Sequence, residues 1–199
     1  SYGADSVRLF ILSDSPPEKD VQWSENGMSS AFKYVQKFWL MNEKIASILK
    51  KEKLELSNEE LDIFTNQAIN KINLALEKFR YNVIIAVFHE IYTFLNKLAE
   101  KNINNSNLKE NYKKILIVMM PVIPHITNEC LEKIDEKKDI KWPSVKKEFI
   151  ENDKVNIVIQ VNGKKRSIMT VEKNLEEKVL IQKIKQDKLI DKYTENKEI

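Results

Sequence analysis

The residues best suited to binding chemistry are three consecutive cations that follow an Asn-Gly dipeptide: Lys164, Lys165 and Arg166. Before the dipeptide, apolar and polar side chains alternate over residues 155–161, which is close to the period of a half-buried strand. Asn162 followed by Gly163 favours a two-residue type I′ turn, because both central residues of that turn need a positive φ. We therefore predict a β-hairpin whose returning strand covers residues 167–171. The three cations at the edge of this hairpin suit the binding of a polyanion. The alternative interpretation is that they only form a solvated hairpin tip.

Side chains that could act in catalysis or bind a metal are few and isolated. His125 and Glu129 lie four residues apart on a predicted helix, but two ligands are too few for a metal site, and a capping or hydrogen-bonded histidine is the favoured interpretation. His89 lies in an apolar helix and is interpreted as a core-edge residue. Cys130 has no histidine at a recognisable spacing and is predicted to be a small buried hydrophobe. With no Gly-rich phosphate loop and no cysteine pair for zinc, the sequence predicts no catalytic residue and no metal site.

The composition indicates a globular, mainly helical protein. Of 199 residues, 42% are hydrophobic and 32% are charged, and 3 glycines and 5 prolines are too few for a turn-rich sheet protein. The 33 basic and 30 acidic residues give a net charge of +3, so any basic surface must be local. A single cysteine excludes an internal disulfide and fits a reducing compartment, the cytoplasm. No apolar run is long enough to span a membrane.

Helical periodicity covers most of the first 135 residues. Ser24 is a candidate N-cap for a long helix that reaches about Lys51, and Ser57 opens a capping box for a second helix. The pattern is interrupted at residues 79–82. The other predicted helices cover residues 4–13, 83–98, 108–120 and 125–134. Lysines on one side of the long helix, and an arginine at the interruption, are further candidate contacts: Lys33, Lys37 and Arg80. The tryptophans are interpreted as packing anchors: Trp23, Trp39 and Trp142.

The last 50 residues show a different pattern: strand, strand, then a helix from about Leu175. Two strands alone are marginally stable, so we interpret this part as truncated. The expected fold is mainly α, an antiparallel helical bundle followed by a small, truncated α+β domain. The expected parts are residues 1–24 (junction helix and connector), 25–135 (bundle), 136–150 (linker) and 151–199 (partial C-terminal domain). A start at Ser1 without an initiator methionine suggests a piece of a longer protein.

Several stretches resemble one family. Residues 2–24 resemble the segment that follows the Lys-Met-Ser-Lys-Ser loop in bacterial leucyl-tRNA synthetases. Residues 79–82, Phe-Arg-Tyr-Asn, look like the Phe-Arg-Phe-Asn stretch of the same helical domain. Residues 121–129 are similar to the Pro-x-x-Pro-His-Ile-x-x-Glu pattern of the aliphatic class I synthetases. The most specific match is residues 158–166, which resemble the leucyl enzymes and not their isoleucyl or valyl relatives.

The resemblance implies a division of labour within a longer enzyme. The parent activates leucine with ATP and Mg²⁺ and transfers it to tRNA(Leu), using catalytic and editing domains outside this chain. This chain would be the helical domain called anticodon-binding together with most of the C-terminal domain. It would hold the tRNA through shape and backbone contacts and need no cofactor. The missing catalytic domain is its expected partner in cis, and the apolar surface that this domain would cover favours self-association. That surface is expected at Val7, Phe10 and Ile11.

By matching position, the resemblance implies tRNA contact at six residues: Lys164, Lys165, Arg166, Arg80, Lys33 and Lys37. Asn162 and Gly163 would fix the turn, and Asp5 and Arg8 would brace the junction with the catalytic domain. Two alternatives stay open, namely the same region of an isoleucyl- or valyl-tRNA synthetase and a non-enzymatic helical interaction module.

Overall fold

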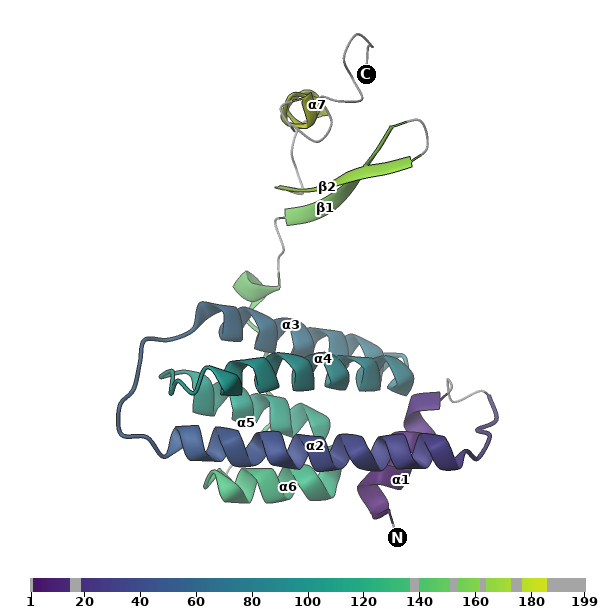
Figure 1. The fold of residues 1–199 in the computed structure, drawn as a ribbon, viewed down its shortest axis with the longest axis vertical. Coiled ribbons are helices and arrows are strands. Elements are labelled where there is room, and N and C mark those ends of the chain that lie inside the picture. Colours follow the sequence, from purple (N-terminus) through teal and green to yellow (C-terminus); the bar gives the residue numbers. More distant parts are fainter. Residues whose placement is uncertain are drawn as a thin grey trace. The chain divides into compact units, whose positions relative to one another are not determined.

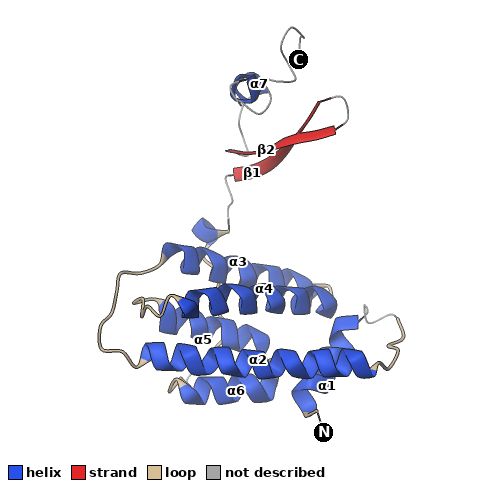
Figure 2. Ribbon diagram, in the orientation of Figure 1, coloured by secondary structure: helices blue, strands red, loops and turns tan. Residues whose placement is uncertain are grey.

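The chain folds into two compact units, Ser1–Ile150 and Glu151–Ile199, in the computed structural model (Figure 1). The structure describes residues 2–14, 19–136, 140–150, 154–161, 164–172 and 177–185. Helices of the first unit are α1 (Ala4–Asp14), α2 (Glu25–Leu49), α3 (Glu59–Glu77), α4 (Tyr81–Glu100), α5 (Leu108–Met119), α6 (Pro124–Lys133) and the 3-10 helix η1 (Lys147–Phe149). The second unit contains β1 (Lys154–Val161), β2 (Lys164–Glu172) and α7 (Glu177–Lys185). The predicted fold class, a helical bundle followed by a small α+β unit, is confirmed (Figure 2).

The helices of the first unit enclose one hydrophobic core. α3 packs against α4 and α5, and α2 packs against α1, α4 and α6 (Figure 1). The hydroxyl of Tyr112 donates to Asn42 Oδ1 at 2.9 Å, and that of Tyr34 donates to the carbonyl of Phe88 at 2.9 Å. Burial raises the pKa of both tyrosines, so their hydroxyls stay protonated as donors. The bundle therefore has fixed polar contacts inside its core.

Of the two helix caps predicted from the sequence, one is confirmed and one is corrected. Ser24 caps α2 as predicted, because its Oγ accepts a hydrogen bond from Gly27 N at 3.2 Å. The capping box at Ser57 is wrong by one residue. Asn58 is the N-cap of α3, and its Oδ1 accepts from Leu61 N at 3.3 Å. The backbone N–H of Asn58 donates to Asn107 Oδ1 at 3.0 Å, so a residue from the start of α5 fixes the cap.

Among the described residues, three helices are followed, just after the C-cap, by a residue with a positive φ, which is the left-handed conformation common at that position. Asn102 (φ 55°) follows α4, Asp135 (φ 57°) follows α6, and Phe79 (φ 51°) follows α3. Asparagine and aspartate tolerate this conformation, whereas a bulky residue there is an outlier. The interruption predicted at residues 79–82 is found at residues 78–80, because α3 ends at Glu77 and α4 already begins at Tyr81. This turn is its cause.

The burial of the tryptophans and of Phe10 differs from the prediction. Trp23 is 62% exposed and Trp142 is 46% exposed, and neither fills the core. Only Trp39 is partly buried against the core. Phe10, predicted to lie in an exposed apolar area, is buried instead and contacts the Trp23 ring edge-on, with centroids 5.5 Å apart. It is buried because Gly27 leaves room for its ring on α2.

Residues 140–150 of the segment interpreted as a linker pack along α3. Lys146 N donates to Asn66 Oδ1 at 2.9 Å. Trp142 Nε1 donates to Asn73 Oδ1 at 3.0 Å. The described part of this segment thus belongs to the first unit, and the division between the units follows Ile150.

The described part of the second unit contains an antiparallel strand pair, β1 and β2. Ile157 lies opposite Met169, and Val158 lies opposite Ile168. One face of the pair is covered, with Ile159 and Val171 buried, while Val158 and Ile168 on the other face are about half exposed. The alternation expected for residues 155–161 is present over residues 157–160, the part of this stretch whose side-chain burial the structure describes.

Candidate nucleic-acid interface

The predicted hairpin is present, and its three cations begin β2. Val161 pairs with Lys164, and Gln160 pairs with Lys165. The returning strand therefore starts three residues earlier than residue 167, because pairing resumes directly after the connection. Two residues separate the paired ends, which is the length of a two-residue turn. Those residues, Asn162 and Gly163, lie outside the described residues, as do the side chains of Lys164 and Lys165.

A β-bulge lies within the cationic run. Ile159 pairs with Ser167 and Gln160 pairs with Lys165, so Arg166 is the extra residue on β2. A bulge bends and twists its strand and re-aims the side chain that it carries. Arg166 is exposed. The direction of Arg166 is therefore set by the bulge and not by the simple alternation of the strand.

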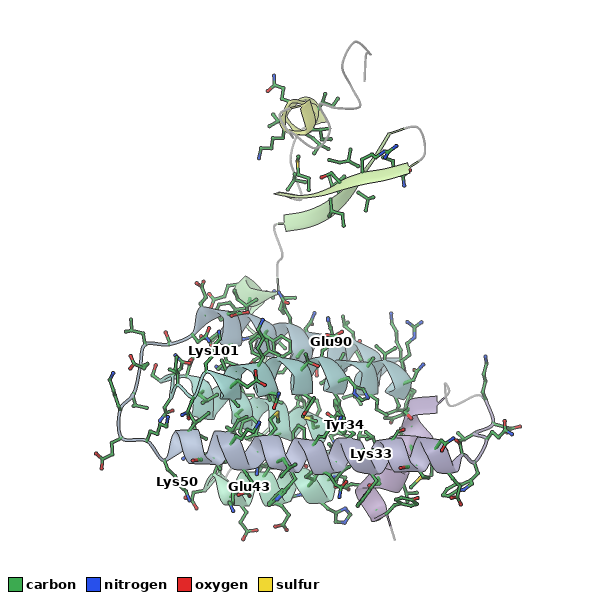
Figure 3. The ribbon with its side chains drawn as sticks, in the orientation of Figure 1. Lys33, Tyr34, Glu43, Lys50, Glu90 and Lys101 are labelled. Carbon is green, nitrogen blue, oxygen red and sulfur yellow. The ribbon has the colours of Figure 1, made fainter. Side chains whose placement is uncertain are left out.

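Lys33 and Lys37 border an apolar cavity of about 770 Å³ in the first unit (Lys33 is labelled in Figure 3). They lie about one turn apart on α2, and both are exposed. The opposite walls come from the start of α1 and from α6, including Tyr2 and Ile126. These two lysines thus flank an apolar hollow and not a continuous basic surface.

Arg80 lies in a different place, at the turn between α3 and α4. It is exposed and borders a depression of about 360 Å³ together with Lys71 and Lys78. Lys71 is paired with Glu90, with 2.7 Å between Nζ and Oε2 (Glu90 is labelled in Figure 3). The structure therefore groups Arg80 with Lys78, which the sequence analysis did not single out.

Asp5 is a buried carboxylate that caps a helix other than its own. Its Oδ2 accepts from Ile126 N at 2.7 Å, and its Oδ1 accepts from His125 N at 3.3 Å. Nδ1 of His125 lies 2.8 Å from the same Oδ1. These backbone groups are the first amides of α6, whose own N-cap, Ile123, has no side-chain acceptor. Asp5 supplies the missing acceptor.

Arg8 binds the backbone just before α6, in the turn that connects α5 to α6. Its Nε donates to the carbonyl of Val122 at 2.9 Å, and its Nη2 donates to that of Pro121 at 2.7 Å. An anion at the start of α6 and a cation near the end of α5 both complement the helix dipoles. Asp5 and Arg8 thus bind α1 to residues 121–126 within this unit. Their predicted role at a junction with another domain stays a prediction.

His125 and Glu129 both line the large cavity, but His125 Nδ1 is engaged by Asp5. Within the part of the chain that the structure describes, no three His, Cys, Asp or Glu side chains are grouped closely enough to hold a metal ion. The favoured interpretation of His125, a histidine hydrogen-bonded at the start of a helix, matches its contacts.

The remaining candidate groups, His89 and Cys130, both make packing contacts. Burial lowers the pKa of His89, and its ring lies edge-on to Tyr34 with centroids 4.8 Å apart. Cys130 is buried as predicted, and burial raises the pKa of its thiol to about 12. A thiol with that pKa is protonated at neutral pH and is a poor nucleophile.

The family model described as the anticodon-binding domain of tRNA ligase matches residues 58–181. Because the match covers more than half of the chain, the chain belongs to the anticodon-binding domain family of tRNA ligases. No described helix is long and apolar enough to cross a membrane.

The similar curated proteins are leucine–tRNA ligases, which confirms the resemblance drawn from the motifs. The ligase of Fusobacterium nucleatum is 31% identical over 88% of this chain and 22% of its own length. That of Campylobacter concisus is 33% identical over 100% of this chain and 24% of its own length. The chain thus spans about a quarter of the length of these relatives. A crystallised LeuRS of Agrobacterium radiobacter, in a ternary complex with tRNA and LeuAMS, shares the fold with a TM-score of 0.70, at 20% identity over 92% of this chain and 25% of that chain.

Two features of the candidate interface were missed from the sequence. The bulge at Arg166 depends on which residues of β2 pair with β1, and alternation alone does not specify this register. The second feature is the exposed Phe79 beside Arg80, which has a positive φ. The sequence analysis interpreted residues 79–82 as an interruption of the helix and as a family motif, and it gave Phe79 no role of its own.

Proposed function

We propose that this chain is the tRNA-binding part of a leucine–tRNA ligase and that it positions tRNA(Leu) for leucylation. The observation that carries the proposal is the alignment of 88–100% of the chain with leucine–tRNA ligases, together with the anticodon-binding domain match. ATP and Mg²⁺ would be used by the catalytic domain of the longer enzyme, which would be cytoplasmic.

The geometry supports a binding role. The described groups that could react are engaged or protonated: His125 contacts Asp5, and the Cys130 thiol has a raised pKa. The cations lie in separate small groups on rigid elements, at β2, on α2 and at the turn before α4. Lysine and arginine at such points contact phosphates and fix the orientation of an RNA without reading its sequence.

The hairpin contact is tested by fluorescence anisotropy of labelled tRNA(Leu), titrated with salt. The variant is the triple change Lys164→Ala, Lys165→Ala, Arg166→Ala. A matched control removes the same charge from the exposed lysines at the ends of α2 and α4: Lys50, Lys97 and Lys101 (Lys50 and Lys101 are labelled in Figure 3).

We expect the hairpin variant to bind more weakly and to reduce the slope of log K against log salt by up to about 3, because each phosphate contact contributes about 1. The control should change the slope less. Equal slopes for the hairpin variant and the unchanged chain would show that these cations are solvated.

The chain alone should not activate leucine. We expect no leucine-dependent pyrophosphate exchange above background when it is incubated with ATP and Mg²⁺. Exchange that depends on this chain would contradict the assignment of the chemistry to another domain.

A further inference from the structure

The turn between α3 and α4 places an aromatic residue where a glycine is usual. The backbone N–H of Arg80 donates to the carbonyl of Ala75 at 2.8 Å, and that of Phe79 donates to Leu76 at 3.0 Å. These two bonds define a Schellman motif, in which the residue after the C-cap takes the left-handed conformation. That residue is Phe79, with a φ of 51°.

The same conformation elsewhere in the chain is adopted by better-suited residues. Asn102 follows α4 and Asp135 follows α6, and short polar side chains of this kind hydrogen-bond locally when φ is positive. Phe79 has no such side chain, and the residue is 63% exposed, so burial does not offset the strain. Its one aromatic neighbour among the described residues is Tyr81, whose ring lies 6.5 Å away, tilted by 59°. The stability of the fold therefore does not explain the phenylalanine.

Cations lie on both sides of this ring in the sequence. Lys78 and Arg80 are exposed and form no ion pair with a described residue. Both border the depression of about 360 Å³, whose apolar lining includes Leu74 and Val83. The acids nearby are Glu77, exposed at the end of α3, and Glu90, which is paired with Lys71. The turn thus combines an exposed ring with two available cations.

We propose that Phe79 is a stacking platform for an unpaired base of the bound tRNA, with Lys78 and Arg80 contacting the flanking phosphates. The inference rests on the proposed tRNA-binding function and adds to it a contact to a base. Unpaired bases of RNA are commonly bound by aromatic stacking, and a nucleotide presents a ring face and a phosphate at adjacent positions. A protein segment would have to supply an apolar group between two anions to fit as well. Phe79 is exposed at this turn, so its ring is accessible to an RNA base.

The test compares Phe79→Asn with Phe79→Trp in the full 199-residue chain. Asparagine suits the left-handed conformation and removes the ring, whereas tryptophan keeps a stacking surface. The matched control is Asn102→Gly, a change at the equivalent exposed position after α4. The probes are labelled tRNA(Leu) and a fully paired RNA duplex of similar length, both followed by anisotropy. Thermal unfolding of each variant is measured in the same buffer.

We expect Phe79→Asn to weaken tRNA binding about fivefold or more and to change duplex binding by less than about twofold, because stacking needs an unpaired base. Its thermal midpoint should equal or exceed that of the unchanged chain. Phe79→Trp and Asn102→Gly should retain binding within about twofold, and the fluorescence of the introduced tryptophan should be quenched by tRNA.

Three results would overturn the stacking contact. Unchanged tRNA affinity in Phe79→Asn shows that the ring does not touch RNA and leaves a protein partner as the occupant of this turn. An equal loss of affinity for the duplex shows that the ring does not act through an unpaired base. A loss of affinity that accompanies a lower midpoint in Phe79→Asn shows that the ring is structural. If the unchanged chain does not bind tRNA(Leu) in a salt-dependent way, the proposed function itself fails, which separates the two failures.

Discussion

Cys130 shows how burial controls the chemistry of a single residue. Its thiol is enclosed by the core, and its pKa is raised to about 12. At pH 8 the thiolate is therefore scarce and shielded. We expect a thiol reagent at pH 8 to modify the folded chain only as fast as it unfolds, while the same chain in denaturant reacts at once. Rapid modification under native conditions would contradict the burial of this residue.

Gly27 carries a second prediction for a single residue. A Cβ added at Gly27 would lie 2.5 Å from Cε2 of Phe10, whose ring is buried. Replacing a helical glycine with alanine usually stabilises by up to about 1 kcal/mol, but here we expect Gly27→Ala to destabilise by about 1–3 kcal/mol. Urea unfolding measures the change.

A compensating variant separates this clash from any other effect of the methyl group. Phe10→Leu in the Gly27→Ala background should recover part of the lost stability, since the smaller side chain leaves space for the methyl. A stabilised Gly27→Ala single variant would show that Phe10 and α2 are not in close contact.

Single residues were predictable where the signal is local. Ser24 was identified as a cap because its partner lies three residues away on the same helix. The cap of α3 was predicted one residue too early. The true cap, Asn58, is fixed by a hydrogen bond from its backbone N–H to Asn107, which lies 49 residues away in the sequence. Burial of Phe10 and exposure of Trp23 depend on how α1 meets α2, which helical spacing does not specify.

Helix ends are held together by residues of other helices. Asp5 on α1 accepts the first amides of α6, and Arg8 donates to carbonyls after α5. We expect Asp5→Asn to destabilise the first unit by about 1–3 kcal/mol, because the amide cannot accept from all three donors. Thermal or urea unfolding measures this loss, with Asp20→Asn as an exposed control. Equal stability of both variants would contradict the capping role of Asp5.

Elements were predicted better than their contacts. The helices and the hairpin follow from periodicity and from the Asn-Gly dipeptide, and the structure contains them. The packing of residues 140–150 on α3 was missed because it rests on side chains of Asn66 and Asn73, which look like ordinary surface residues in the sequence. The bulge at Arg166 was missed for a similar reason, since the register is set by both strands together.

The first unit contains a complete core of its own. The buried apolar cluster and the partly buried residues packed against it all lie between Val7 and Val145. We therefore expect residues 1–150 to retain the helical circular dichroism of this unit and a cooperative unfolding transition after removal of residues 151–199. A non-cooperative transition in the shortened chain would show that the last 49 residues are needed for the bundle.

The proposed function depends on which tRNA the whole chain binds. A competition measurement decides this, in which unlabelled tRNA(Leu) or tRNA(Ile) displaces labelled tRNA(Leu) from the chain at fixed salt. We expect leucine tRNA to compete at a concentration several-fold lower than isoleucine tRNA, through contacts of shape and backbone. Equal competition by the two tRNAs, or stronger competition by isoleucine tRNA, would contradict it.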